Sequence, residues 1–261
     1  MLTVSTATKQ LFHTNPRIGM AEQCLKSNFD PQSAPPRACR NKREANLKPI
    51  RSSPSMQRIK ARQQIDPCEK WRLAAATVNR DRFEQNYNNP VLTAEDRIFF
   101  QKASQHPDGP RKLLVIAEAW CGDVYRELPT AVRIAESAGI DLRIFLRDEN
   151  PDIMDEFLSN NGKSRAIPVF VFYTTDTKYI THFTERSASA HAGLALAMEQ
   201  ARARLNLPAS ATFGNLPDPA RREFLLDVIS RIEPLADQWR RDAVKEIRQL
   251  LASALHLSDA A

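Results

Sequence analysis

Cysteine is scarce in this chain of 261 residues, which contains four: Cys24, Cys39, Cys68 and Cys121. So few cysteines in a chain of this length exclude a small secreted scaffold held together by many disulfides. Their spacing is not that of a metal site, and the five histidines are isolated from one another, so we expect no metal and no cofactor. These absences favour a soluble protein of a reducing compartment, and we expect it to be cytoplasmic.

Long apolar runs are also absent, and none reaches the roughly 18 residues that a membrane helix needs, so no membrane partner is expected. Acidic residues are scarce in residues 1–65, which hold 3 Asp and Glu against 12 Lys and Arg. The whole chain has a formal net charge of +6. The segment therefore carries +9 and the remainder −3, so nucleic acid is the least favoured partner for the folded part.

Residues 1–66 are predicted to be a disordered basic extension, because they combine few aliphatic residues with six prolines. Three interpretations stay open. The segment is a plain extension, including one that precedes a true start at Met20 or Met56; it is an organelle-targeting segment; or it is a nucleic-acid-binding arm around the basic cluster at 37–43.

The hydrophobic pattern of the rest predicts an α/β fold. Residues 113–117 form a continuous apolar run, typical of a strand covered on both faces by helices. Residues 71–87 show a polar pattern with a few possible inward positions. A helix from about Thr93, with Ile98, Phe99 and Phe100 buried, then precedes this strand. Further elements alternate along the chain: a helix over 123–138, a strand over 140–146, a helix from about 152 to 161, strands over 166–173 and 179–184, and a helix over about 188–205. We therefore expect an α/β sandwich around a mixed four-stranded sheet.

Two amphipathic helices, over 218–232 and 235–257, are predicted to form a C-terminal helical extension spanning 215–257. Asp218 is the expected N-cap, with Pro219 at the first helical position. The second helix carries an apolar stripe of Leu235, Trp239, Val244, Ile247, Leu251 and Leu255. This stripe either packs back on the rest of the chain or forms a surface for self-association.

Cys121 is the candidate for chemistry, because it lies where the first apolar strand meets the next helix. The amides and the positive dipole end of a helix N-terminus stabilise a thiolate, which would make Cys121 nucleophilic near neutral pH. The alternative is that Cys121 is a small buried apolar side chain.

Trp120-Cys121-Gly122 resembles the start of the Trp-Cys-Gly-x-Cys active site of the thioredoxin family. Pro129 falls where thioredoxins kink the following helix, and Ile167-Pro168 falls where the family carries its cis-proline opposite the active site. The resemblance covers about residues 93–205, implies a thioredoxin-like domain over 67–208, and is nearest to poorly characterised bacterial-type members. It implies catalysis by Cys121 and a substrate groove formed by Trp120, Gly122, Asp123, Ile167 and Pro168.

Two departures from the family pattern bear on function. Val124 stands where thioredoxins have the resolving cysteine, and Val115 stands where they have a buried acid. The resemblance therefore implies a monothiol scheme, either thiol-disulfide exchange or deglutathionylation, with protein thiols, disulfides or glutathione as partners. Asp123 either opposes a thiolate by its charge or serves the start of the helix, and the second role is favoured. The alternative function is a catalytically silent thioredoxin-fold adaptor that only binds.

Overall fold

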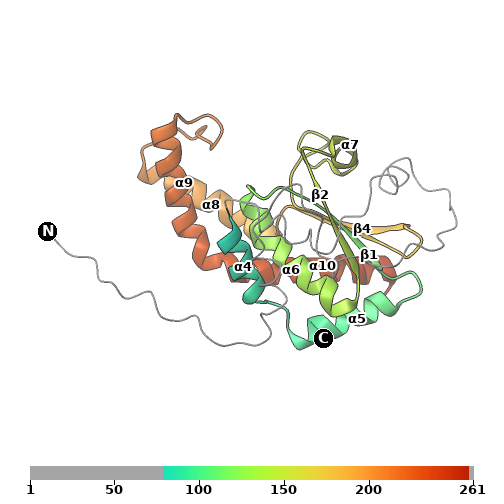
Figure 1. The fold of residues 1–261 in the computed structure, drawn as a ribbon. Coiled ribbons are helices and arrows are strands. Elements are labelled where there is room, and N and C mark those ends of the chain that lie inside the picture. Colours follow the sequence, from blue (N-terminus) through green and yellow to red (C-terminus); the bar gives the residue numbers. More distant parts are fainter. Residues whose placement is uncertain (1–78, 259–261) are drawn as a thin grey trace, which may run out of the picture. The chain divides into compact units, whose positions relative to one another are not determined.

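A computed structural model of the protein describes residues 79–258. Four strands form one mixed sheet in the order β2-β1-β3-β4 (Figure 1). Strand β1 (Lys112–Ala117) pairs in parallel with β2 (Asp141–Leu146), while β3 (Val169–Tyr173) is antiparallel to both β1 and β4 (Tyr179–Thr184). The predicted fold class is confirmed. The predicted extension over 1–66 lies outside the described residues, as do Cys24, Cys39 and Cys68 and the first part, 71–78, of the polar segment 71–87.

The register of the sheet places the two candidate motifs at the same end of its central strands, β1 and β3. Ile116, near the end of β1, pairs with Val169, the first residue of β3. Because these strands run in opposite directions, the chain that leaves β1 towards Cys121 starts beside the chain that enters β3 from Pro168. The apolar strands thus bring together two segments that are 46 residues apart in the sequence.

Helix α6 (Gly122–Ala138) follows β1 and packs against β2, α4 (Arg80–Asn88) and α5 (Ala94–Gln105). Its end at Gly139 agrees with the prediction, since this residue adopts the left-handed conformation with φ +66°. The start of α5 at Thr93 also agrees. There the Thr93 side chain accepts from the Asp96 backbone N–H and the Asp96 side chain accepts from the Thr93 N–H.

Two local predictions are wrong. Ile98 is exposed, because the face of α5 that meets α6 and α10 carries Phe99 and Phe100 instead. The helix expected over about 152–161 is only α7 (Pro151–Met154) followed by the 3₁₀ turn η2 (Asp155–Phe157). After this turn a bridge between Ser159 and Ser164 closes a loop in which residues 160–162 have positive φ, so the helix cannot continue.

The C-terminal helices are α8 (Ala188–Arg204), α9 (Asp218–Ile232), the 3₁₀ turn η3 (Glu233–Leu235) and α10 (Ala236–Leu255). Helix α8 was expected to complete the sandwich, but it packs mainly on α9, and α10 covers β4 instead. The residues of α8 that are buried are alanines, which allow close helix packing but offer a sheet little apolar bulk. The predicted cap of α9 also shifts by one residue, because Pro217 is the N-cap and Asp218 begins the helix.

Two apolar clusters result. The sheet core combines the strands with α4, α5, α6 and most of α10, while the helical cluster consists of Ala190, Ala197, Ala201, Ala211, Leu216, Phe224, Val228, Ile232 and Trp239. The predicted stripe of α10 divides between them. Trp239 joins the helical cluster, the residues from Val244 onward join the sheet core, and Leu235 is exposed. The stripe is therefore packed within the chain, and self-association stays a prediction.

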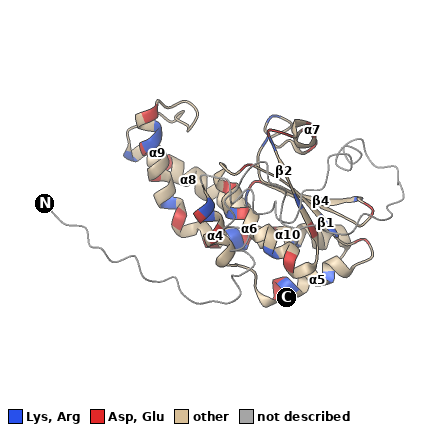
Figure 2. Cartoon of the chain, in the orientation of Figure 1, with Lys and Arg blue, Asp and Glu red and all other residues tan. Residues whose placement is uncertain are grey.

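Acidic and basic residues alternate over the described elements instead of gathering by sign (Figure 2). This mixture agrees with the small negative balance of the sequence beyond its basic segment. Across residues 79–258, no helix combines the length and the apolar character needed to cross a membrane.

Candidate functional site

Cys121 is the N-cap residue of α6, directly after the loop that leaves β1. Its backbone N–H donates to the carbonyl of Glu118 at 3.1 Å, which fixes the turn into the helix. Its sulfur donates to the carbonyl of Ile167 at 3.6 Å. The side chain is partly buried, and within residues 79–258 it is the one cysteine and is not in a disulfide.

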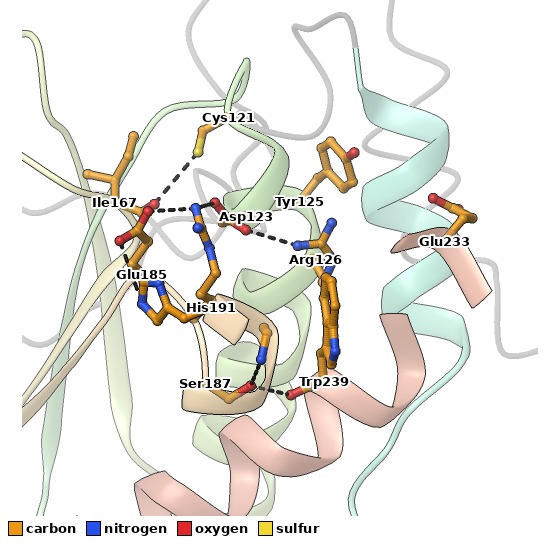
Figure 3. A network of polar contacts seen from close by, with 12 residues as sticks. Cys121, Asp123, Tyr125, Arg126, Ile167, Glu185, Ser187, His191, Glu233 and Trp239 are labelled. Carbon is orange, nitrogen blue, oxygen red and sulfur yellow. Dashed lines mark hydrogen bonds and ion pairs between the residues drawn. The ribbon is translucent and has the colours of Figure 1, made fainter. Parts of the chain in front are cut away.

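Ile167 and Pro168 connect Cys121 to a second loop. The peptide bond between them is cis. The Ile167 carbonyl accepts from Cys121, and the next carbonyl, that of Pro168, accepts from the backbone N–H of Glu185 at 2.7 Å. The start of β3 thus holds both the cysteine at the head of α6 and the turn that follows β4. Figure 3 shows Cys121, Ile167, Asp123 and Glu185 grouped in this way.

Asp123 lies in the first turn of α6 between two guanidinium groups. One carboxylate oxygen accepts from Arg126 at 2.9 Å, and the other accepts from Nη2 of Arg186. The same Nη2 also donates to Glu185, whose second oxygen lies 3.8 Å from His191. The side chains of Asp123, Arg126 and Arg186 are largely buried, so solvent screens these ion pairs less than it screens surface pairs. The favoured role for Asp123, at the start of the helix, therefore includes holding two cations.

The pKa of the Cys121 thiol is raised above its ordinary value, which is the opposite of the direction expected from a helix N-terminus. Burial is the largest cause, because it penalises the charged thiolate. The backbone N–H groups of Val124 and Asp123 lower the pKa as expected, and so does the charge of Arg186, whereas the Asp123 carboxylate raises it. The helix N-terminus lowers the thiol pKa as expected, but burial raises it by more. Sequence position does not reveal how deeply the sulfur is buried.

The remaining predicted site residues flank Cys121 in the chain. Trp120 is largely exposed, at 57%, and the Arg147 guanidinium lies over its ring at 4.9 Å. Gly122 is the first residue of α6, where an added Cβ would lie 3.6 Å from the Tyr125 hydroxyl, so this position tolerates a side chain. An exposed tryptophan beside a thiol offers an apolar contact to an incoming peptide or to glutathione.

A buried valine occupies the position at which thioredoxins have the resolving cysteine. Val124 and Val115 are both fully buried in the sheet core. A buried acid is present nevertheless, because Glu127 on α6 is only 1% exposed and neither carboxylate oxygen has a hydrogen-bond partner. Burial raises the pKa of Glu127 to about 8, although nearby Arg126 and Arg240 oppose this shift. The carboxyl is therefore predominantly protonated at neutral pH.

Sequence reasoning missed Arg126, Glu127, Glu185 and Arg186. The three-residue spacing from Asp123 to Arg126 on one helix was a signal that could have identified that pair. No comparable signal exists for Arg186, which is 63 residues from Asp123 and reaches it only because β4 ends beside β3. The described residues contain no cluster of His, Cys, Asp and Glu that could hold a metal ion.

Comparison with known proteins identifies one family and two solved structures. A family model described as thioredoxin matches residues 70–202, slightly more than half of the chain. The first solved structure is an HIV epitope-scaffold protein with 14% identity and a TM-score of 0.38; the match covers 71% of this chain and 86% of that one. The second is a protein of unknown function from Pseudomonas aeruginosa with 18% identity and a TM-score of 0.37, covering 64% and 85%. No curated protein matches this chain.

Proposed function

The chain belongs to the thioredoxin family, and on that premise we propose that it carries out monothiol thiol-disulfide exchange, including deglutathionylation, through Cys121. The observation that supports the proposal most is the position of the sulfur. It lies at the head of α6, partly accessible, next to an exposed tryptophan and the carbonyl that precedes Pro168. A buried valine at the resolving position limits this motif to one thiol.

The proposed cycle has two exchanges. In the first, the Cys121 thiolate attacks the glutathione sulfur of a glutathionylated protein, a Cys121–glutathione disulfide forms, and the protein thiolate leaves and takes up a proton. In the second, the thiolate of another glutathione attacks this mixed disulfide, which releases oxidised glutathione and restores Cys121. Each turnover thus reduces one protein–glutathione mixed disulfide to the protein thiol. It consumes one glutathione thiol, which leaves joined to the released glutathionyl group as oxidised glutathione.

The raised thiol pKa defines how this activity depends on pH. Only the thiolate attacks a disulfide, and its fraction increases as the pH approaches the thiol pKa. We therefore expect the exchange rate to increase steadily from pH 6.5 through pH 8.5, instead of being constant across neutrality as for a cysteine with a lowered pKa.

The test uses a glutathionylated peptide in an assay coupled to glutathione reductase. The full chain is compared with Cys121→Ser and with a variant in which Cys24, Cys39 and Cys68 are all serine. We expect Cys121→Ser to abolish the activity and the triple variant to retain it. Equal rates for the wild type and Cys121→Ser would overturn the proposal.

A second candidate is a thioredoxin-fold adaptor that binds peptides without turnover. The observation in its favour is the combination of a raised thiol pKa with Trp120 left exposed. This candidate predicts that a peptide bound by the wild type is bound equally well by Cys121→Ser but weakly by Trp120→Ala. Fluorescence anisotropy with a labelled peptide measures that difference.

A further inference from the structure

Arg186 lies two residues after the end of β4, and its charge lowers the pKa of the Cys121 thiol. Its neighbour Glu185 is bound through its backbone N–H to the Pro168 carbonyl at 2.7 Å. Since the preceding carbonyl, that of Ile167, accepts from the Cys121 sulfur, these backbone bonds fix the 185–186 turn beside the cysteine. The placement follows from hydrogen bonds of the main chain.

The guanidinium of Arg186 is held by two carboxylates on one nitrogen. Nη2 donates both to Asp123 and to Glu185, while Nε is buried and has no hydrogen-bond partner in the described part of the chain. A guanidinium has five donors in a rigid plane, so this arrangement leaves donors unused on a cation that is already fixed in place. The ordering of the side chain is therefore established before any thiolate forms.

The charges around the cysteine are balanced while its thiol is neutral. Asp123 and Glu185 carry two negative charges, and Arg126 and Arg186 carry two positive ones. Two other titratable groups lie near these charges: His191, 3.8 Å from Glu185, and Glu127, whose pKa is raised to about 8 by burial and is also influenced by Arg126, Asp123 and Arg186. Ionisation of Cys121 adds one negative charge, and the positive charge of Arg186 lowers the pKa of the thiol.

We propose that Arg186 is the positioning residue for the chemistry of Cys121: its guanidinium stabilises the thiolate, and its bonds to Asp123 and Glu185 hold it where it can do so. The inference deepens the proposed function and rests on it for its biological meaning. It also gives Asp123 a defined place, as a group that opposes the thiolate directly but retains the cation that favours it.

The test measures the rate of alkylation of Cys121 by iodoacetamide from pH 6 to about pH 11, a range that extends above the raised thiol pKa. The protein is the full chain with Cys24, Cys39 and Cys68 changed to serine, so that Cys121 is the thiol that reacts with iodoacetamide. We expect Arg186→Gln to move the midpoint of the pH profile upward by about one unit, which lowers the alkylation rate near pH 7.5 about tenfold. Arg186→Lys keeps the charge and should shift the midpoint less.

Two further variants separate charge from structure. Arg204→Gln is the matched control, because Arg204 is also an arginine bound by two carboxylates, Asp227 and Glu223, but belongs to the α8–α9 pair. We expect its profile to equal the wild type's. Asp123→Asn removes a negative charge while Glu185 still holds Arg186, so its midpoint should fall. A general loosening of the site would instead move Asp123→Asn and Arg186→Gln in the same direction.

Failure of this inference is distinguishable from failure of the proposed function, because alkylation requires no turnover. An unchanged profile for Arg186→Gln, or equal upward shifts for Arg186→Gln and Asp123→Asn, overturns the role of Arg186 even if deglutathionylation is observed. A shifted profile in a protein without Cys121-dependent turnover supports the role of Arg186 and overturns only the proposed function.

Discussion

The sheet core and the helical cluster differ in the size of the side chains that form them. The sheet core is formed by bulky aromatic and branched side chains on strands that are covered by helices. The helical cluster has four alanines among its nine members, together with Phe224 of α9 and Trp239 of α10. The candidate site lies on the sheet core, because the loop after β1 and the loop before β3 meet at Cys121. Similar burial thus positions the candidate site in one region and joins α8 to α9 in the other.

The largest expected effect comes from removing one phenylalanine from each region. Phe170 in β3 and Phe224 in α9 are both fully buried. Each change to alanine should lower the free energy of unfolding by about 3–5 kcal/mol, because transfer free energy is lost and a cavity remains. Urea denaturation measures this loss.

The two variants should nevertheless differ at the site. Phe170 lies two residues from Pro168, so Phe170→Ala should loosen the Ile167 carbonyl and accelerate alkylation of Cys121, whereas Phe224→Ala should not. Equal alkylation rates in the two variants would show that the site does not depend on the sheet core. Phe170→Leu and Phe224→Leu provide the same comparison if either alanine variant fails to fold.

The next effect is expected where α10 passes from one region to the other. There the Arg126 guanidinium lies 5.5 Å from the centre of the Trp239 ring, and Glu127 is fully buried near Arg240. The pKa of Glu127 is about 8 in the folded protein against an ordinary value of 4.5. The folded state therefore binds the additional proton between these values, and its stability falls as the pH rises through about 8.

Glu127→Gln should remove this dependence, which amounts to at most about 1.4 kcal/mol per pH unit. The thermal unfolding temperature of the wild type should fall from pH 6 to pH 9, and that of the variant should change less. Glu199→Gln, at an exposed position on α8, is the control and should follow the wild type. A variant as pH-dependent as the wild type would contradict the assignment.

The smallest effect is expected at Gly193, where α8 meets α10. A Cβ added there would lie 2.5 Å from Cζ2 of Trp239, closer than atoms can approach. Gly193→Ala should cost about 1–3 kcal/mol through overpacking, less up to about 1 kcal/mol from the better helix propensity of alanine. The smaller ring in Trp239→Phe should relieve the overlap, so a double-mutant cycle measured by urea denaturation should show favourable coupling. Additive costs would mean that Gly193 does not contact this ring.

The amino-acid sequence was sufficient to predict most of the elements and the class of fold. Apolar periodicity located the strands and α6, a turn residue placed its end at Gly139, and the resemblance around Trp120-Cys121-Gly122 identified the family that the comparison found. These features are local, because a strand, a helix end or a short motif is specified by residues adjacent in the chain.

The remaining features depend on which elements pack against each other, and only the tertiary structure shows them. It placed α10 instead of α8 on the sheet, buried Cys121 enough to reverse the expected direction of its pKa, and brought Arg186 to Asp123 across 63 residues. Desolvation and ion pairing act through space, and two residues far apart in the chain meet only when strands such as β3 and β4 pair. The cysteine was visible in the sequence, but the charges that govern its thiolate were not.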